Sequence, residues 1–253
     1  MDIRLALMSG IDVPIPECQL TCTPPKIKEI AFLGEETFFS GLQYLCIKKE
    51  QLNQDKNIPS ETTNFQIFKM VMDNKETADK KTNVQQVLTL CFPKYKVMLT
   101  PRALVFNLDK QNFIVDENNF DFFQSYFEQI FCLGGKAEDK FNPANAAAQK
   151  IAEKLMRGRR IVAEQKRAEN GNKNVSILSQ YTSILSVGLH IPLQDLLDLT
   201  IYQLYDLVER YRLWAAWDID TRARLAGANP ESQPDDWMKN LHEINIKNKT
   251  ITN

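Results

Sequence analysis

The histidines and cysteines of this chain, which could bind a metal, are few and mostly far apart in the sequence. His190 and His242 are its two histidines, and neither has a partner at a spacing typical of a metal site. Cys18 and Cys22 lie four positions apart, but no second pair of Cys or His residues completes a set of four ligands. We therefore expect ordinary surface or half-buried histidines, buried thiols, no metal and no cofactor.

Motifs for covalent or phosphate chemistry are also missing from the sequence. It contains no glycine-rich phosphate loop, no G-x-S-x-G and no H-E-x-x-H. Asp218 and Asp220 are two apart, so on a helix their carboxylates point in different directions and make a poor catalytic pair. We expect a protein that is not an enzyme. The competing hypothesis is an enzyme whose site is assembled from scattered residues, for which a deep polar pocket would be the sign.

A run of cations between residues 150 and 167 could contact phosphates. The cations are Lys150, Lys154, Arg157, Arg159, Arg160, Lys166 and Arg167, and they outnumber Glu153 and Glu164. Such a helix could bind nucleic acid. It could equally be a solvated face, or one that meets an acidic partner, since the segment has no aromatic residue on which a base could stack. Nucleic acid retention in filter binding at low salt tests this hypothesis.

The strongest periodic signal in the chain runs over residues 199–242. Thr200 and Gln203 have the spacing of a capping box, and Gly227 followed by Pro230 marks the end of a helix. Between them an inner stripe recurs at steps of three and four residues. The stripe consists of Ile201, Leu204, Tyr205, Val208, Tyr211, Arg212, Ala215 and Ile219, and it is widened by Leu207, Trp214 and Trp217. The pattern predicts a helix of about 40 Å with partners on two sides.

The three tryptophans of the chain all lie in this stretch. Trp214 and Trp217 are on the predicted helix, and Trp237 follows a polar, proline-containing segment at 229–234. Packing in a core is one interpretation. Docking on a partner is the other, because large aromatic side chains dominate the energetics of interfaces. The predicted partner-binding residues are Tyr205, Tyr211, Trp214, Trp217, Arg222, Arg224 and Trp237.

The elements before residue 135 mix strands and helices. Alternation at Ile3, Leu5 and Leu7 predicts a strand, and residues 19–23 predict a second, edge strand that 26–30 could continue. Alternating segments at 95–99, 104–108 and 113–115 predict an antiparallel meander. Helical spacing is found after Gly34, over about 62–72 and 84–92, and in an aromatic segment that Asn118 or Asn119 could cap.

The remainder of the chain reads as helical. A basic helix is expected from about residue 144 to 169, then one over 176–187 closed by Gly188, then a short helix beginning at Pro192. The sequence thus predicts an α+β fold: a small antiparallel sheet with helices in an N-terminal domain, residues 1–135, and an all-helical C-terminal domain with an extended tail, residues 136–253.

Composition places the chain among ordinary globular proteins. It has 253 residues, of which 25% are charged and 43% hydrophobic, with a formal net charge of −1. The balanced charge argues against a surface built entirely for nucleic acid. Five cysteines without a secretory signal indicate reduced thiols, and hence a cytosolic protein or one assembled in a cytosol. No transmembrane span is expected.

Three segments of the C-terminal region resemble a known group of proteins. LTIYQLYDLVERY, WDIDTRARLAGA and DDWMKNLH are similar to the C-terminal region of tail-morphogenesis proteins of tailed bacteriophages, most closely tail assembly chaperones and the small proteins encoded near the tape-measure gene. IKEIAFLGEETFF in the N-terminal half has a weaker similarity. The resemblance implies a non-enzymatic protein that binds the tape measure or other tail proteins and keeps them soluble. Many such chaperones are smaller than this chain.

The sequence therefore predicts a phage virion assembly protein, resembling a tail assembly chaperone, that binds tape-measure, tube or baseplate proteins through its C-terminal helical region. A structural tail or baseplate subunit and a nucleic-acid-binding protein that uses residues 150–167 are the alternatives. The expected location is the host cytoplasm during assembly, and the virion tail for a structural subunit. No membrane contact is expected.

Overall fold

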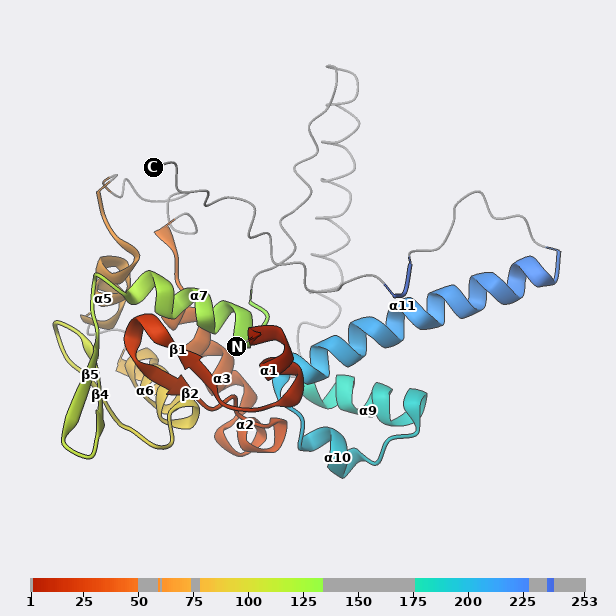
Figure 1. Cartoon of the computed structure of the whole chain (residues 1–253), viewed down its shortest axis with the longest axis horizontal. Helices are drawn as coiled ribbons and strands as arrows, with labels where there is room; N and C mark the ends of the chain where they lie inside the picture. The colour runs from red at the N-terminus through yellow and green to blue at the C-terminus, as the bar shows by residue number, and fades with distance from the viewer. Residues whose placement is uncertain are drawn as a thin grey trace, which may run out of the picture.

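The computed structural model of the protein describes residues 2–49, 59, 61–73, 78–133, 176–227 and 236–238. Up to residue 133 it contains helices and two small antiparallel sheets, and from 176 to 227 it contains helices (Figure 1). The α+β class, with a sheet and helices in the N-terminal region and helices in the C-terminal region, is confirmed. No helix among these residues combines the length and the apolar character that crossing a membrane requires.

The described elements follow one another in this order. They are α1 (Ile3–Ser9), β1 (Val13–Ile15), the 3₁₀ turn η1 (Pro16–Cys18), β2 (Leu20–Cys22), α2 (Ile27–Leu33), α3 (Glu35–Leu45), α5 (Asn64–Asp73), α6 (Ala78–Cys91), β3 (Lys96–Leu99), β4 (Leu104–Leu108), β5 (Gln111–Val115), α7 (Phe120–Ile130), α9 (Ile177–Leu189), α10 (Leu193–Leu197) and α11 (Ile201–Leu225). The first sheet pairs β1 with β2, and the second has the order β3-β4-β5.

The predicted first strand is wrong, because residues 3–9 form a helix. The carboxylate of Asp2 accepts hydrogen bonds from the backbone N–H groups of Arg4 and Leu5, at 2.9 and 3.4 Å. Gly10, at φ +66°, closes the helix in the left-handed conformation that glycine adopts at little cost. Caps at both ends therefore outweigh a short alternating pattern, and Leu5 is left exposed.

The extension of the second strand over 26–30 is also wrong, although β2 itself is confirmed. Glu29 accepts a hydrogen bond from the backbone N–H of Lys26 at 2.8 Å, which starts α2 instead. Ile27 and Ile30 are then buried on one face of the helix.

The meander is confirmed. β4 pairs with both neighbours, and Leu108 lies opposite Gln111 across a tight turn. The two residues of that turn, Asp109 and Lys110, both have positive φ (49° and 72°), as type I′ hairpins require. The inward residues of the sheet, among them Phe106, face the aromatic helix α7.

Phenylalanine rings join the sheet to the helices. The ring centroid of Phe92, just after α6, lies 4.7 Å from that of Phe106 on β4 and 5.9 and 6.0 Å from those of Phe123 and Phe127 on α7. Such edge and offset contacts stabilise the core beyond the area that they bury. All four rings are fully buried.

Helices α3 and α6 approach each other closely because α3 carries a glycine at their contact. A Cβ atom on Gly41 would lie 2.7 Å from the carbonyl oxygen of Asn83 and 2.6 Å from Cγ2 of Val87, both on α6. Only a residue without a side chain fits this close packing.

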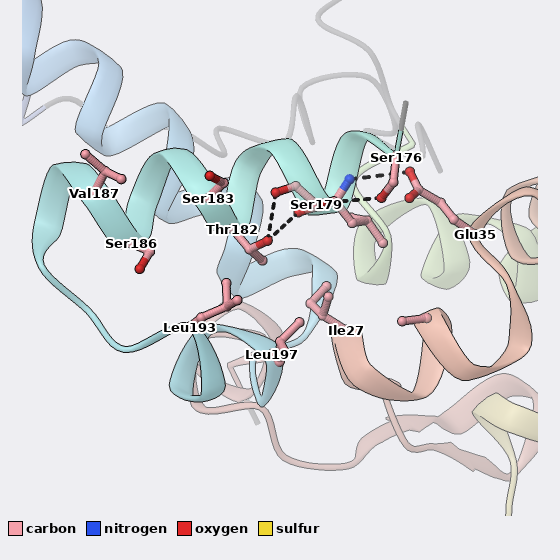
Figure 2. A pocket seen from close by; sticks show the side chains of 12 residues that line it. Ile27, Glu35, Ser176, Ser179, Thr182, Ser183, Ser186, Val187, Leu193 and Leu197 are labelled. Carbon is pink, nitrogen blue, oxygen red and sulfur yellow. Dashed lines mark hydrogen bonds between the residues drawn. The ribbon is translucent and has the colours of Figure 1, made fainter. Parts of the chain in front are cut away.

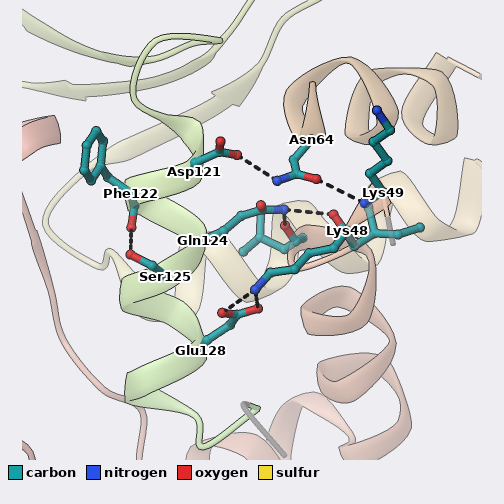
Figure 3. Close-up of polar contacts among 10 residues, drawn as sticks. Lys48, Lys49, Asn64, Asp121, Phe122, Gln124, Ser125 and Glu128 are labelled. Carbon is teal, nitrogen blue, oxygen red and sulfur yellow. Dashed lines mark hydrogen bonds and ion pairs between the residues drawn. The ribbon is translucent and has the colours of Figure 1, made fainter. Parts of the chain in front are cut away.

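A polar cluster ties α7 to the end of α3 (Figure 3). The buried amide of Gln124 donates to the carbonyl oxygens of Leu45 and Ile47, at 2.9 and 3.1 Å. One turn later, Glu128 forms an ion pair with Lys48 at 2.6 Å. The last carbonyl groups of a helix have no partner within that helix. At the end of α3, Gln124 of α7 supplies the missing donor.

The C-terminal helices contact the N-terminal region directly. The backbone N–H of Ile27 donates to the carbonyl of Leu199 at 2.8 Å. The amide of Gln203 donates to the carbonyl of Met8 at 2.8 Å, which joins α11 to the end of α1. One hydrophobic cluster is continuous from Leu7 to Leu204.

Candidate functional site

The first half of α11 is anchored in the body of the protein. The predicted capping box is confirmed: Thr200 accepts from the N–H of Gln203, and the Gln203 side chain accepts from the N–H of Thr200 at 2.9 Å. Ile201 and Leu204 are buried, and the helix contacts α1 on one side and α9 on another. The expectation of partners on two sides is confirmed for this half.

Two of the predicted partner-binding residues fill the contact between α11 and α9. The rings of Tyr205 and Tyr181 meet edge to face at 5.8 Å, and burial raises the pKa of Tyr205 to about 12. Tyr211 lies against Gly188, where an added Cβ would be 2.4 Å from the ring. These two tyrosines are therefore half-buried packing residues in this structure. Gly188 does not close α9 as predicted, since the helix continues to Leu189 and His190 caps it.

Leu213 is the last buried residue of α11, and the C-terminal half of the helix projects away from the body (Figure 1). Arg212 and Ile219, expected on the inner stripe, are both exposed, so that part of the stripe prediction is wrong. Trp214, Trp217 and Leu225 are separated by three and eight residues and lie on a single face, with exposed fractions of 40, 37 and 84%. We call these three residues the tryptophan face.

The two predicted arginines of this half pair with carboxylates on their own helix. Arg222 bonds to Asp218 at 3.0 Å, and Arg224 bonds to Asp220, each pair four residues apart. Acid-to-base pairs at this spacing stabilise an exposed helix by roughly 0.2–0.5 kcal/mol each. They support helix α11 where it has left the body, and they leave a mostly apolar tryptophan face between them.

Trp237 contacts α11 at two residues, one before Leu213 and one after it. Its ring centroid is 6.2 Å from that of Trp217, and its carbonyl oxygen accepts a hydrogen bond from the guanidinium of Arg210. Arg210 was not among the predicted residues. The signal that could have found it is its position seven residues before Trp217, which places a donor two turns away on the same face.

A groove of about 680 Å³ lies between α2, α9 and α10 (Figure 2). Among its described lining residues are Leu178, Leu193 and several hydroxyl side chains of α9. Two of those hydroxyls donate to backbone carbonyls: Thr182 to that of Leu178 at 2.9 Å, and Ser186 to that of Ile191 at 2.9 Å. Glu35 accepts from the N–H groups of Ile177 and Leu178 at the start of α9. Thr182, Ser186 and Glu35 therefore each form a bond to the backbone that a catalytic role would have to break.

The sulfur atoms are held as free thiols. Cys18, Cys22, Cys46 and Cys91 are buried and Cys132 is partly buried, and none forms a disulfide. Burial raises the pKa of Cys18 and Cys132 to about 12, so their thiols stay protonated at neutral pH. Within the described parts of the chain, no three His, Cys, Asp or Glu side chains gather closely enough to hold a metal ion.

The candidate nucleic-acid residues cannot be placed in the same way. Lys150, Lys154, Arg157, Arg159, Arg160, Lys166 and Arg167 lie outside the described residues, as does His242. Binding of nucleic acid by this segment stays a hypothesis.

The surface built from α9, α10, α11 and Trp237 falls within a recognisable sequence unit. Residues 170–242 match the family described as YomV second domain. This family is phage-derived, so the match supports a phage protein. No curated protein and no solved structure matches the chain.

The match to the YomV second domain covers less than a third of the 253 residues. It includes the anchored half of α11, the tryptophan face and Trp237, but not the α+β region. It begins at residue 170, whereas the sequence predicted a division at 135/136, and that division stays a prediction.

Proposed function

We propose that this chain is a non-enzymatic phage assembly protein that binds another tail protein through the outer half of α11, in the manner of a tail assembly chaperone. The phage-derived match over residues 170–242 supports a phage origin. The resemblance of 199–242 to tail-morphogenesis proteins supports the finer role. The expected partners are tape-measure, tube or baseplate proteins, met in the host cytoplasm.

The observation that carries the proposal is the tryptophan face. Trp214, Trp217 and Leu225 stay substantially exposed on a helix that projects from the body. Exposed tryptophans close together on one face cost free energy in water, and they are the side chains most enriched at the centres of interfaces. A structural helix with no partner would place polar residues at these positions.

The partner that fits this face offers an apolar surface. The arginines at its margin already pair with Asp218 and Asp220, so the face has little unpaired charge to attract an acidic partner. An apolar helix or an aromatic segment would bury the indole rings. The contact is thus expected to depend on shape and apolar area more than on salt.

Co-expression with the products of neighbouring genes, followed by capture on the tagged chain, tests the proposal. We expect capture of one identified tail protein by the wild type and a loss of at least roughly tenfold with Trp214→Ala, since truncating an interface anchor costs on the order of 2 kcal/mol. Phe32→Ala is the matched control, because Phe32 is 97% exposed on α2 and does not belong to the tryptophan face. Equal capture by all three chains would overturn the proposed surface.

Mass spectrometry of purified virions separates the chaperone from a structural subunit. A chaperone leaves before the tail is complete, so the chain should be absent or far below the copy number of the tail proteins. Stoichiometric presence would favour the structural tail or baseplate subunit and reject the chaperone.

A further inference from the structure

The segment at 236–238 lies beside α11 (Figure 1). It makes two contacts there: the ring of Trp237 packs on the ring of Trp217, and the carbonyl of Trp237 accepts a hydrogen bond from Arg210. The N–H of Met238 donates to the carboxylate of Asp236 at 2.9 Å, which turns the chain at this point. Helix α11 thus contacts both the side chain and the backbone carbonyl of Trp237.

This contact shares a residue with the tryptophan face. Trp217 contacts Trp237 and also belongs to the face that we assign to a partner, so Trp237 and the partner would compete for its ring. Trp214 and Leu225, the other two residues of the face, stay exposed. The segment therefore contacts one residue of the tryptophan face, Trp217, while the other two are exposed.

The contact is small enough to be exchanged. Trp237 is only partly buried, and Met238 is 70% exposed. Only 20 residues separate Trp217 from Trp237 in the sequence. A tethered segment of this kind has an effective concentration in the millimolar range, so a weak contact suffices to keep it in place until a better ligand arrives.

We propose that Trp237 is an intramolecular occupant of the tryptophan face, and that the partner replaces it with a peptide segment presenting an aromatic side chain to Trp217 and a backbone carbonyl to Arg210. This inference rests on the proposed function and specifies its ligand. The partner's segment binds where Trp237 lies in the partner-free protein. Trp237 therefore competes with the partner and lowers the apparent affinity of the chain for it.

A labelled peptide of residues 231–242, ESQPDDWMKNLH, tests this occupancy by fluorescence anisotropy against the full-length chain. The Trp237→Ala chain should bind it roughly tenfold more tightly than the wild type, because the tethered competitor is gone. Met238→Ala, in the same segment but exposed, should bind as the wild type does. A peptide with alanine in place of its tryptophan should not bind.

Two double variants locate the site at which the peptide binds. Adding Trp217→Ala or Arg210→Ala to Trp237→Ala should return binding to the wild-type level or below. Equal peptide affinity of the wild type and Trp237→Ala, or binding that ignores Trp217 and Arg210, would overturn the inference. A dimer of the wild type that Trp237→Ala converts to monomer would also overturn it, since the segment would then be exchanged between copies.

The capture assay distinguishes this inference from the proposed function. If Trp237→Ala raises capture of the tail protein severalfold and Trp214→Ala abolishes it, both hold. Capture that needs Trp214 but is unchanged by Trp237→Ala keeps the proposed function and rejects the occupant. Capture that ignores Trp214 rejects the proposed function, whatever the peptide does.

Discussion

At the scale of single residues, close packing and local charge decide what each position tolerates. Gly41 illustrates the first, because the backbone of α6 fills the space that a side chain would need. Asp12 illustrates the second. Its carboxylate accepts hydrogen bonds from Lys94 at 2.6 Å and from Thr23 at 2.8 Å, and it holds the chain between α1 and β1 against the end of α6.

Gly41→Ala should destabilise the protein although alanine favours helices. The gain in helix propensity is about 1 kcal/mol, whereas forcing a methyl group against the Asn83 carbonyl separates α3 from α6 at a cost of about 1–3 kcal/mol or more. Chemical denaturation measures the difference. Gln43→Ala, at an exposed position of the same helix, is the control and should change little. A stabilised Gly41→Ala protein would contradict this packing.

Asp12 should make stability depend on pH in the acid range. The hydrogen bond from Lys94 lowers the pKa of Asp12 below its ordinary 3.8. A lowered folded pKa means that this stabilisation is complete above the unfolded pKa and is lost as pH falls through the folded one. The gap in unfolding free energy between the wild type and Asp12→Asn should therefore be largest near neutral pH and shrink below about pH 4. Asp109→Asn, which removes a carboxylate from the exposed hairpin turn, is the control variant.

At the scale of elements, side chains of one helix satisfy the end of another. The side chain of Gln124 on α7 is 1% exposed. Its amide donates to the carbonyls of Leu45 and Ile47 at the end of α3. This position was not singled out from sequence, because a glutamine inside an aromatic helix gives no periodic signal of its own.

Gln124→Met should cost about 1–3 kcal/mol of unfolding free energy, because it fills the same space but removes the donor from the buried carbonyl of Leu45 and the partly buried carbonyl of Ile47. Urea denaturation measures the loss. Gln180→Met, on the exposed side of α9, introduces the same side chain without removing a buried bond and should be nearly neutral. Equal stability of the two variants would show that the Gln124 bonds contribute nothing.

At the scale of the whole molecule, the N-terminal α+β region and the first half of α11 share a hydrophobic core. Leu7 and Leu204 belong to one cluster, and Gln203 bonds to Met8 across the same contact. The outer half of α11 lies outside that core. The molecule thus holds the tryptophan face on a helix whose first half is packed into the body.

Because this core is continuous, we expect the described helices of the C-terminal region to unfold together with the sheet region. Leu204→Ala should lower the single calorimetric transition as a whole, with a cost of about 2–5 kcal/mol. Ile219→Ala, on the projecting half of the same helix, should leave the transition nearly unchanged. Two separated transitions, of which Leu204→Ala moves only one, would instead support independent domains.

Much of the architecture could be predicted from local pattern. The capping box at Thr200, the meander and the aromatic helix all have strong periodic or turn signals, and each is present. The two false strands came from runs of only a few alternating residues. In both, side chains that bond to the backbone at a helix start decided the outcome, which alternation does not register.

The candidate site was predicted only in part. The aromatic residues of α11 were identified from their types, but sequence could not divide them between packing and exposure. Tyr205 and Tyr211 turned inward because α9 lies alongside them, with Tyr181 and Gly188 at the contact. Trp214 and Trp217 stayed exposed because α9 and α1 end before reaching them.

The sequence by itself determined that a long aromatic helix follows Thr200, since capping and periodicity are local properties of the chain. Only the tertiary structure decided where along that helix the body of the protein stops and which face Trp237 covers. Those depend on contacts between residues distant in sequence, such as Gly188 with Tyr211 and Trp237 with Trp217, and no spacing along the chain specifies them.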